Sequence, residues 1–181
     1  GEEAADDALL AVLFTSGTSG RSKGACLSWS NFAASALAAA DLLGPAIAER
    51  WLACMPLFHV GGLSIVVRSV LFGGPMRLHS RFDAALVSDA LDAGDIAGVS
   101  LVPTMLSRLL DHRGPRPAPA GLHVLLLGGA AASPELLARA RFAGYPVCPT
   151  YGLTEATSQV ATARPQRPGA TRPAPMLPLP G

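Results

Sequence analysis

The sequence predicts one α/β domain in which helices pack on a mainly parallel β-sheet. Short apolar runs alternate along the chain with helical segments, and the connections between them are short, which is the pattern of a parallel sheet. Some of the runs, such as residues 122–127, are apolar without interruption, as expected for strands that are buried on both faces. Half of the 181 residues are hydrophobic, which is enough to build one core.

The predicted strands are residues 8–14, 25–28, 51–55, 76–79, 98–102, 122–127 and 146–150. The predicted helices are residues 28–43, 83–93, 105–111 and 134–142, and residues 63–72 are helical or extended. The first two strands flank a loop and predict a hairpin. The first helix begins with serine and asparagine, whose side chains can accept hydrogen bonds from free backbone N–H groups, and it ends before Gly44 and Pro45.

The later elements also have recognisable boundaries. Residues 51–55 form a continuous apolar run that Pro56 ends. Residues 83–93 are amphipathic, as expected of a helix that covers a sheet. Ser133 precedes Pro134, and proline is favoured at the first position of a helix. Residues 112–121 are rich in Pro, Arg and Gly and predict a surface loop.

The end of the chain differs in composition from the rest. Residues 164–181 hold six prolines and three arginines, so they cannot form a regular helix and are typical of a linker or an edge segment. We therefore expect an α/β part over residues 1–163, which includes the N-terminal hairpin, followed by a Pro/Arg-rich tail.

Composition narrows the classes of partner. A net charge of +1 argues against a nucleic-acid-binding surface, which needs clustered lysine and arginine. The three cysteines lack the spacing of a metal site or a disulfide framework, which fits a reducing cytoplasm. The apolar stretch of residues 60–72 is interrupted by Arg68 and is too short to span a bilayer, so we expect no membrane partner. The oligomeric state stays open.

The most informative stretch is the loop of residues 14–24, which joins the first two predicted strands. Its candidate ligand-binding residues are Thr15, Ser16, Gly17, Thr18, Ser19, Gly20 and Lys23. Glycines let several backbone N–H groups point into one concavity, and a lysine adds a compact positive charge for phosphate oxygens. A flexible surface turn is the alternative, but ordinary turns seldom combine this Ser-, Thr- and Gly-rich composition with a lysine. The loop is not a Walker A motif, because a strand follows Lys23 in place of a helix.

A second polar segment, residues 150–155, follows the last predicted strand. Ligands gather at the carboxyl edge of a parallel sheet, so Thr150, Tyr151, Gly152, Thr154 and Glu155 are candidates. The Glu155 carboxylate can hold Mg²⁺ while waters and phosphate oxygens fill the remaining positions. The Thr154 hydroxyl can bond a phosphate, and the Tyr151 ring can stack on a purine. Taken alone, the segment is also compatible with a structural turn that caps a helix.

Two further segments carry weaker signals. Gly128, Gly129 and Ala130 lie between a strand and a capped helix, where glycines allow the backbone to approach a flat ligand; a tight turn without a ligand is the alternative. His59 lies in the apolar run of residues 56–62, and a lone histidine in such a run is usually a packed one.

Residues 15–24 resemble the phosphate loop of the adenylate-forming (AMP-binding) superfamily, which includes acyl-CoA synthetases, luciferases and peptide-synthetase adenylation domains. Ser22 stands where that family usually has proline, which makes the loop less rigid but keeps its donors and Lys23. Residues 151–155 match the family's Tyr-Gly-x-Thr-Glu motif.

The resemblance implies that ATP binds with Mg²⁺ and that a carboxylic acid and CoA are the other substrates. In this interpretation Lys23 and its loop hold the β- and γ-phosphates, Thr154 bonds phosphate, and Glu155 binds the metal ion. Residues 128–130 line the adenine pocket, and His59 lies beside the acyl group, where it either positions the acid or gates the tunnel for the thiol. The implied catalytic residues are thus Lys23, His59, Thr154 and Glu155.

Two segments, residues 57–64 and 154–162, resemble more narrowly the o-succinylbenzoate–CoA ligases of menaquinone biosynthesis. In that subgroup the pair Ser158 and Gln159 would bond a second carboxylate or a keto group of the acid. The implied reaction forms an acyl-adenylate and pyrophosphate, after which the CoA thiol displaces AMP. Another aryl- or acyl-CoA synthetase stays open.

A truncated, non-catalytic ATP-binding remnant also stays open. The resemblance places a ribose-binding aspartate, a hinge and a small domain with a catalytic lysine beyond this sequence. An α/β-hydrolase is excluded because the chain has no Gly-x-Ser-x-Gly segment.

Overall fold

The computed structural model describes residues 7–15, 22–166 and 174–179. The strands are β1 (Leu9–Thr15), β2 (Lys23–Ser28), β3 (Trp51–Ala53), β4 (Met76–Leu78), β5 (Gly98–Leu101), β6 (Val124–Leu127), β7 (Val147–Leu153), β8 (Ser158–Ala163) and β9 (Met176–Pro178). The helices are α1 (Trp29–Leu43), α2 (Val60–Phe72), α3 (Ala84–Asp92), α4 (Pro103–Arg113) and α5 (Pro134–Phe142), with the 3-10 helices η1 (Gly44–Ala48) and η2 (Thr154–Ala156).

The main sheet has the strand order β4-β3-β5-β6-β7-β8-β9. Strands β4, β3, β5, β6 and β7 run parallel, and β8 and β9 extend the sheet in antiparallel pairing. The predicted α/β fold with a mainly parallel sheet is therefore confirmed. Its parallel strands all end at one edge, and that edge positions the candidate site.

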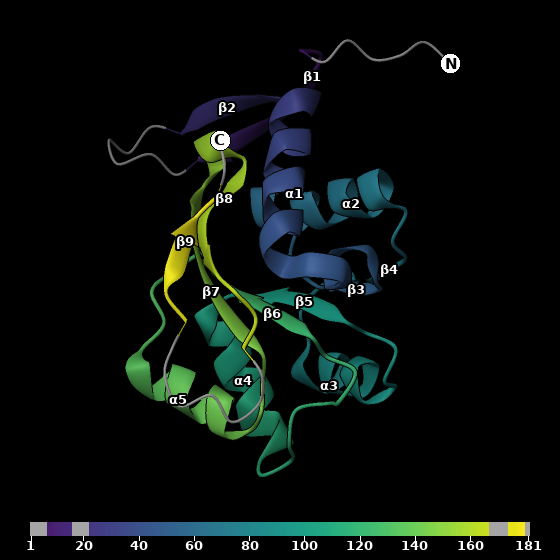
Figure 1. The fold of residues 1–181 in the computed structure, drawn as a ribbon, viewed down its shortest axis with the longest axis vertical. Coiled ribbons are helices and arrows are strands. Elements are labelled where there is room, and N and C mark those ends of the chain that lie inside the picture. The colour runs from purple at the N-terminus through teal and green to yellow at the C-terminus, as the bar shows by residue number, and fades with distance from the viewer. Residues whose placement is uncertain (1–6, 16–21, 167–173, 180–181) are drawn as a thin grey trace.

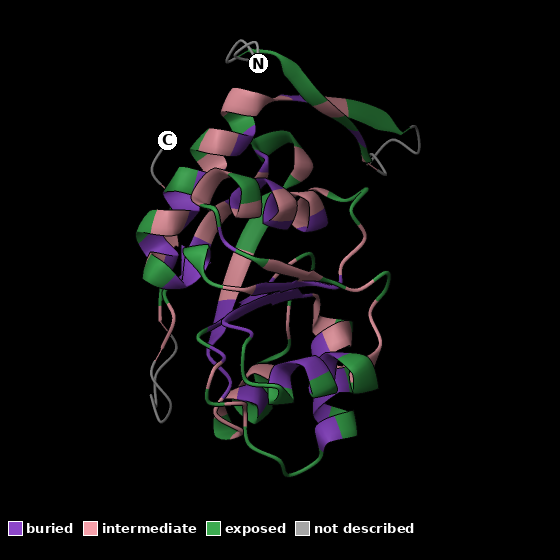
Figure 2. Cartoon of the chain, turned by 90° about the vertical axis from the view of Figure 1, so that its right-hand side faces the viewer, coloured by how far each residue is buried: buried purple, intermediate pink, exposed green. Residues whose placement is uncertain are grey.

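Both faces of the parallel sheet are covered. Alternate side chains of one strand point to opposite faces, so Leu125 packs in a core with α3, α4 and α5, whereas Val124 packs in a second core with α1 and α2. Figure 1 shows α1 and α2 on one side of the sheet and the other three helices on the opposite side. The buried residues concentrate along the strands and the inner faces of the helices (Figure 2). This double coverage explains the uninterrupted apolar runs.

The predicted N-terminal hairpin is present as a separate two-stranded antiparallel sheet of β1 and β2. It packs through Leu13 and Leu27 against Phe32 of α1 and Val67 of α2. The opposite face of β1 exposes Val12 and Phe14. The hairpin thus lies beside the helical layer with its two connecting ends, Thr15 and Lys23, paired with each other.

The predicted helix starts are confirmed by their caps. Ser28 and Asn31 form a capping box at α1, and Ser133 accepts a hydrogen bond from the Leu136 N–H at α5. Residues 63–72, for which the sequence predicted either a helix or a strand, belong to α2.

The C-terminal part contains strands that sequence analysis did not predict. Strand β8 follows η2 directly and pairs with β7, although residues 158–163 lack the alternation of a typical strand. Within the tail, β9 is the edge strand that pairs with β8, in keeping with an edge segment. The division of the chain into an α/β part and a tail at residue 163 stays a prediction. Strand β9 of the tail pairs with β8 of the α/β part.

One helical stretch, Trp29–Ala48, is long and apolar enough to cross a membrane by length and composition alone. Its inner residues, among them Phe32 and Ala39, pack in the cores beside the sheet and the hairpin. Such packing is typical of a core helix in a globular domain, and core helices also meet this criterion of length and composition.

Candidate active site

Three of the predicted segments lie at the carboxyl edge of the parallel sheet. Residues 54–59 follow β3, residues 128–130 follow β6, and residues 150–153 form the end of β7. These segments are far apart in sequence, and the parallel topology alone brings them to one edge. The sheet therefore offers a shared surface for one ligand.

Gly128 and Thr150 are in close contact at this edge. A Cβ atom on Gly128 would lie 2.7 Å from Thr150 Cγ2, which leaves no room for a side chain. Gly129 has a φ of 80° and a Cβ there would lie 3.0 Å from Val102 Cγ1. Packing and backbone conformation thus both demand glycine here, while Ala130 is exposed beyond them. The backbone of residues 128–130 stays open to a flat ligand.

The end of β7 is irregular where its polar motif begins. The pairing of β7 with β8 shifts between Tyr151 and Gly152. Tyr151 is exposed, so its ring is free to stack on a ligand. Thr154 and Glu155 lie in η2, where the Glu155 side chain is exposed and makes no ion pair with any residue of the described segments. An unpaired carboxylate at this edge is available to a metal ion.

The hairpin strand β2 lies against η2, which brings the two strongest sequence motifs together (Figure 1). Lys23 is exposed at the start of β2, and the Thr15 hydroxyl donates to the Lys23 carbonyl oxygen at 3.4 Å. The predicted phosphate-binding residues Ser16, Gly17, Thr18, Ser19 and Gly20 lie outside the described residues. What the structure contributes is the pairing of the loop's two ends, Thr15 and Lys23, in a hairpin whose strand β2 contacts η2.

His59 is the residue that precedes α2, with an extended backbone and no capping hydrogen bond from its side chain. The ring is exposed and lies 4.5 Å from the Phe58 ring, centroid to centroid. The alternative of a packed core histidine is therefore wrong. His59 instead presents its ring at the surface, at the end of the segment that leaves β3.

Arg68 is a buried cation that sequence analysis treated only as an interruption of an apolar run. Its Nη1 donates to Gln159 Oε1 at 3.2 Å, and its guanidinium lies 4.6 Å from the centroid of the Trp51 ring. Burial lowers the pKa of Arg68 to about 10 because the interior disfavours the charged form. No acidic side chain in the described segments forms an ion pair with it, and its Nε has no hydrogen-bond partner there.

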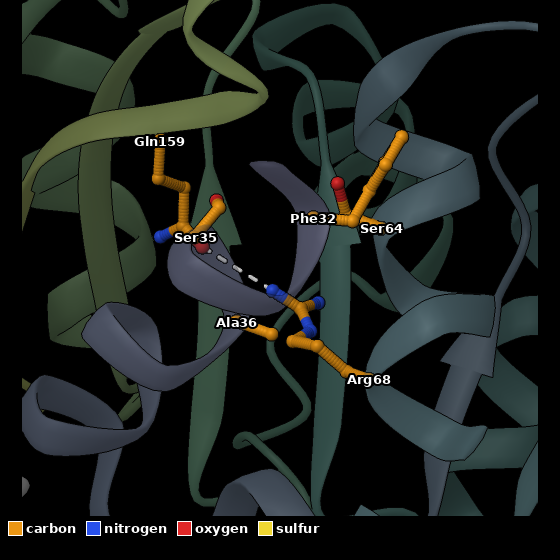
Figure 3. A pocket seen from close by; sticks show the side chains of 6 residues that line it. All are labelled: Phe32, Ser35, Ala36, Ser64, Arg68 and Gln159. Carbon is orange, nitrogen blue, oxygen red and sulfur yellow. Dashed lines mark hydrogen bonds between the residues drawn. The ribbon is translucent and has the colours of Figure 1, made fainter. Parts of the chain in front are cut away.

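A small cavity lies beside this arginine, between α1, α2 and β8. Its lining residues are Phe32, Ser35, Ala36, Ser64, Arg68 and Gln159. Figure 3 shows the Arg68 guanidinium pointing between the two helices toward Gln159. The spacing of Ser64 and Arg68, four residues apart on a largely apolar helix, is the signal from which this polar face could have been inferred.

Hydrogen bonds link this cavity to the carboxyl edge of the sheet. Gln159 Nε2 donates to Thr162 Oγ1 at 2.8 Å, and the Thr162 and Thr150 hydroxyls are 2.8 Å apart. Because Thr150 also contacts Gly128, a chain of polar contacts runs from Arg68 to the glycine turn. The two ends of the site are thereby connected through β8.

The whole chain, residues 1–181, matches the family described as AMP-binding enzyme. The chain belongs to the AMP-binding enzyme family. The adenylate-forming resemblance of its motifs is thus confirmed.

Named relatives of this AMP-binding chain are ligases. The 2-succinylbenzoate–CoA ligase of Bacillus cereus strain Q1 is 38% identical over 161 residues, which are 89% of this chain and 34% of that protein. The chain therefore spans about a third of the length of the relatives that it matches.

Solved structures of the same kind of ligase are also similar to this chain. The o-succinylbenzoate CoA synthetase (MenE) from Bacillus subtilis in complex with the acyl-adenylate intermediate OSB-AMP has a TM-score of 0.84 at 37% identity, covering 89% of this chain and 33% of that one. The same enzyme in complex with ATP and magnesium ion has a TM-score of 0.83 at 37% identity, covering 89% and 34%.

A metal ion in this AMP-binding enzyme would have few protein ligands. Within the described segments, no group of three or more His, Cys, Asp or Glu side chains could hold an ion. Glu155 offers one exposed carboxylate, which suits Mg²⁺ because this ion commonly keeps several waters and takes one or two carboxylates together with substrate phosphates. The chemistry of the available donors fits magnesium bound with a nucleotide.

Proposed function

We propose that this chain is the nucleotide- and acid-binding segment of an ATP-dependent carboxylate–CoA ligase, and that its acid is o-succinylbenzoate. The observation that carries the proposal is the contact of β2 with η2 at the carboxyl edge of the sheet. Strand β2 begins with Lys23 and η2 holds Glu155, so this contact supports a site in which a lysine and a carboxylate act on one metal–polyphosphate complex.

The proposed roles follow from the chemistry of each group. Lys23 and the loop of residues 15–24 bind the β- and γ-phosphates, and Thr154 donates its hydroxyl to a phosphate. Glu155 holds Mg²⁺, which neutralises phosphate charge when it is bound. The backbone of residues 128–130 and the Tyr151 ring flank the adenine. Together these residues orient the α-phosphate for in-line attack by a carboxylate, a reaction that depends chiefly on positioning and charge neutralisation.

The proposed acid is supported by Arg68. A buried guanidinium without an acidic partner is costly, and a ligand carboxylate that paired with it would offset much of that cost. o-Succinylbenzoate carries two carboxylates and a keto group, so one carboxylate can react at the α-phosphate while the other pairs with Arg68. Gln159, Ser35 and Ser64 line the same cavity and offer polar groups to this end of the acid. His59 keeps its positional role beside the acyl group.

The test is ATP–pyrophosphate exchange by the full-length protein with o-succinylbenzoate, benzoate or no acid. We expect exchange that depends on o-succinylbenzoate and Mg²⁺, and formation of the CoA thioester when CoA is added. Exchange with a different acid would overturn the proposed substrate but not the ligase chemistry. ATP binding without exchange for any aryl or acyl acid would overturn the ligase and favour a non-catalytic ATP-binding remnant. A cytoplasmic location stays a prediction.

A further inference from the structure

Thr157 and Ser158 adopt left-handed backbone conformations, with φ of 55° and 90°. They are the non-glycine residues with positive φ in the described part of the chain, and they are consecutive. A β-branched residue such as Thr157 is an outlier in this region, and such strain persists only where the surrounding structure holds it. The pair lies between Glu155 in η2 and Gln159 in β8.

The strained turn is held from several directions. Ser35, in the middle of α1, donates from Oγ to the Thr157 carbonyl oxygen at 2.7 Å, a bond between residues 122 positions apart. The Thr157 N–H donates to the Thr154 carbonyl oxygen at 3.0 Å, and Thr157 is buried. Gly152 packs directly against the Ser158 carbonyl oxygen. Of these contacts, the Ser35 bond is the one made by a side chain of another layer.

The turn separates the two ends of the proposed site. On one side lie Thr154 and Glu155, the proposed phosphate and metal ligands, and on the other lies Gln159, which bonds Arg68. An ordinary extended link would change the direction of β8 relative to η2. The left-handed turn therefore determines where the acid-binding end stands with respect to the phosphate-binding end.

We propose that Ser35 is a positioning residue whose hydrogen bond to the Thr157 carbonyl holds the left-handed turn and so aligns Glu155 with Gln159. The proposal rests on the proposed function for its effect on catalysis. It does not require Ser35 to contact a ligand, although the side chain also lines the cavity beside Arg68 (Figure 3). The experiment must therefore separate an action through the turn from a direct contact.

The experiment compares Ser35→Ala and Ser35→Thr in the full-length protein by ATP–pyrophosphate exchange. The loss of one hydrogen bond predicts a fall in kcat of about fivefold for Ser35→Ala, and Ser35→Thr, which keeps the hydroxyl, retains most activity. The control is Ser30→Ala on the same helix, which removes a hydroxyl that bonds Ser28 Oγ alone among the described residues and should leave kcat unchanged. An unchanged kcat in Ser35→Ala would overturn the proposal.

The decisive arm adds Thr157→Gly to Ser35→Ala, because glycine adopts the left-handed conformation without strain. We expect this double variant to recover most of the lost kcat. Thr157→Ala, which removes nearly the same atoms but keeps the strain, should not. Failure of Thr157→Gly to recover kcat, or a rise in the KM for the acid alone that Thr157→Gly fails to correct, would assign Ser35 to direct ligand contact and overturn the proposal. Equal recovery by both substitutions would show that backbone strain at Thr157 is not what Ser35 offsets, and would overturn it too.

A second readout does not depend on catalysis. In the protein without ligands, Ser35→Ala should accelerate amide hydrogen exchange in a peptide that covers residues 154–160, and Ser30→Ala should not. Unaltered amide hydrogen exchange in residues 154–160 would overturn the positioning role of Ser35, even if the full-length protein is an active ligase. Accelerated amide exchange in a protein that shows no ATP–pyrophosphate exchange would leave the turn's dependence on Ser35 intact and overturn only the proposed function.

Discussion

The carbonyl oxygen of Ser158 occupies the space that a Cβ atom of Gly152 would need. The two residues lie on adjacent antiparallel strands, next to the shift in pairing between Tyr151 and Gly152. The glycine of the Tyr-Gly-x-Thr-Glu motif is therefore required by the close approach of β8. Its function is to let the strand that carries Gln159 pack against the strand that carries Tyr151.

Gly152→Ala should separate β7 from β8, because the added methyl meets backbone atoms that cannot rotate away. We expect a loss of about 3 kcal/mol in the free energy of unfolding and loss of measurable ATP–pyrophosphate exchange. Chemical denaturation and the exchange assay measure the two effects. The control is Gly114→Ala, where φ is 58° and the added Cβ meets no neighbour, so only strain of about 1 kcal/mol is introduced. Equal stability of the two variants would contradict this account.

The parallel sheet could be predicted from sequence because its strands are short apolar runs bounded by Pro, Gly and capping residues. The same reasoning failed for β8, whose residues alternate weakly and become a strand only by pairing with β7 and β9. Strand propensity measures local fit, whereas this strand depends on tertiary contacts.

The motifs proposed to bind the nucleotide could be singled out from sequence because each is contiguous. The pair Arg68 and Gln159 could not, since its members are 91 positions apart and their meeting depends on how α2 crosses β8. An arginine within an apolar helix is a hint of a buried polar site, but the sequence does not name its partner. The strained turn at Thr157 leaves no sequence signal at all, because threonine is an unusual residue for that conformation.

Arg68→Met should separate stability from substrate binding. The pKa of Arg68 is lowered to about 10 by burial, so the guanidinium is charged at neutral pH at a cost to the folded state. Replacing a buried cation by an apolar side chain of similar length should leave the free energy of unfolding unchanged or raise it by about 1 kcal/mol. The rate of ATP–pyrophosphate exchange in the presence of o-succinylbenzoate should fall about 100-fold, which corresponds to the loss of one charged hydrogen-bonded contact.

The pH dependence of stability gives a second check on Arg68. Because the folded-state pKa of about 10 lies below the ordinary arginine value, the unfolded chain binds more protons between the two values, and stability gains from this group as pH rises above about 10. Arg68→Met should lack that gain, whereas the exposed control Arg81→Met should retain it. A large destabilisation of Arg68→Met at pH 7 would show that the arginine is required for the fold.

Lys23→Gln should impair nucleotide binding without affecting the fold, because the side chain is exposed at the start of β2. We expect kcat/KM for ATP to fall about 100-fold and the free energy of unfolding to change by less than about 0.5 kcal/mol. Lys23→Arg keeps the charge but changes its geometry and should recover part of the loss. Unchanged kinetics in Lys23→Gln would remove the lysine from the proposed phosphate site.

The three cysteines should differ sharply in reactivity. Cys54 and Cys148 are buried, and burial raises the pKa of each thiol to about 12, so their reactive thiolates are scarce at pH 8. Cys26 is exposed on β2, on the same face of the hairpin as its cross-strand neighbour Val12. A maleimide applied to the native protein should therefore label Cys26 alone within this segment, as peptide mass spectrometry can verify, and all three after denaturation. In Cys26→Ser no rapid labelling of the segment should remain. Rapid labelling of Cys54 or Cys148 would mean that the core on which β3 and β7 are packed opens far more often than its burial implies.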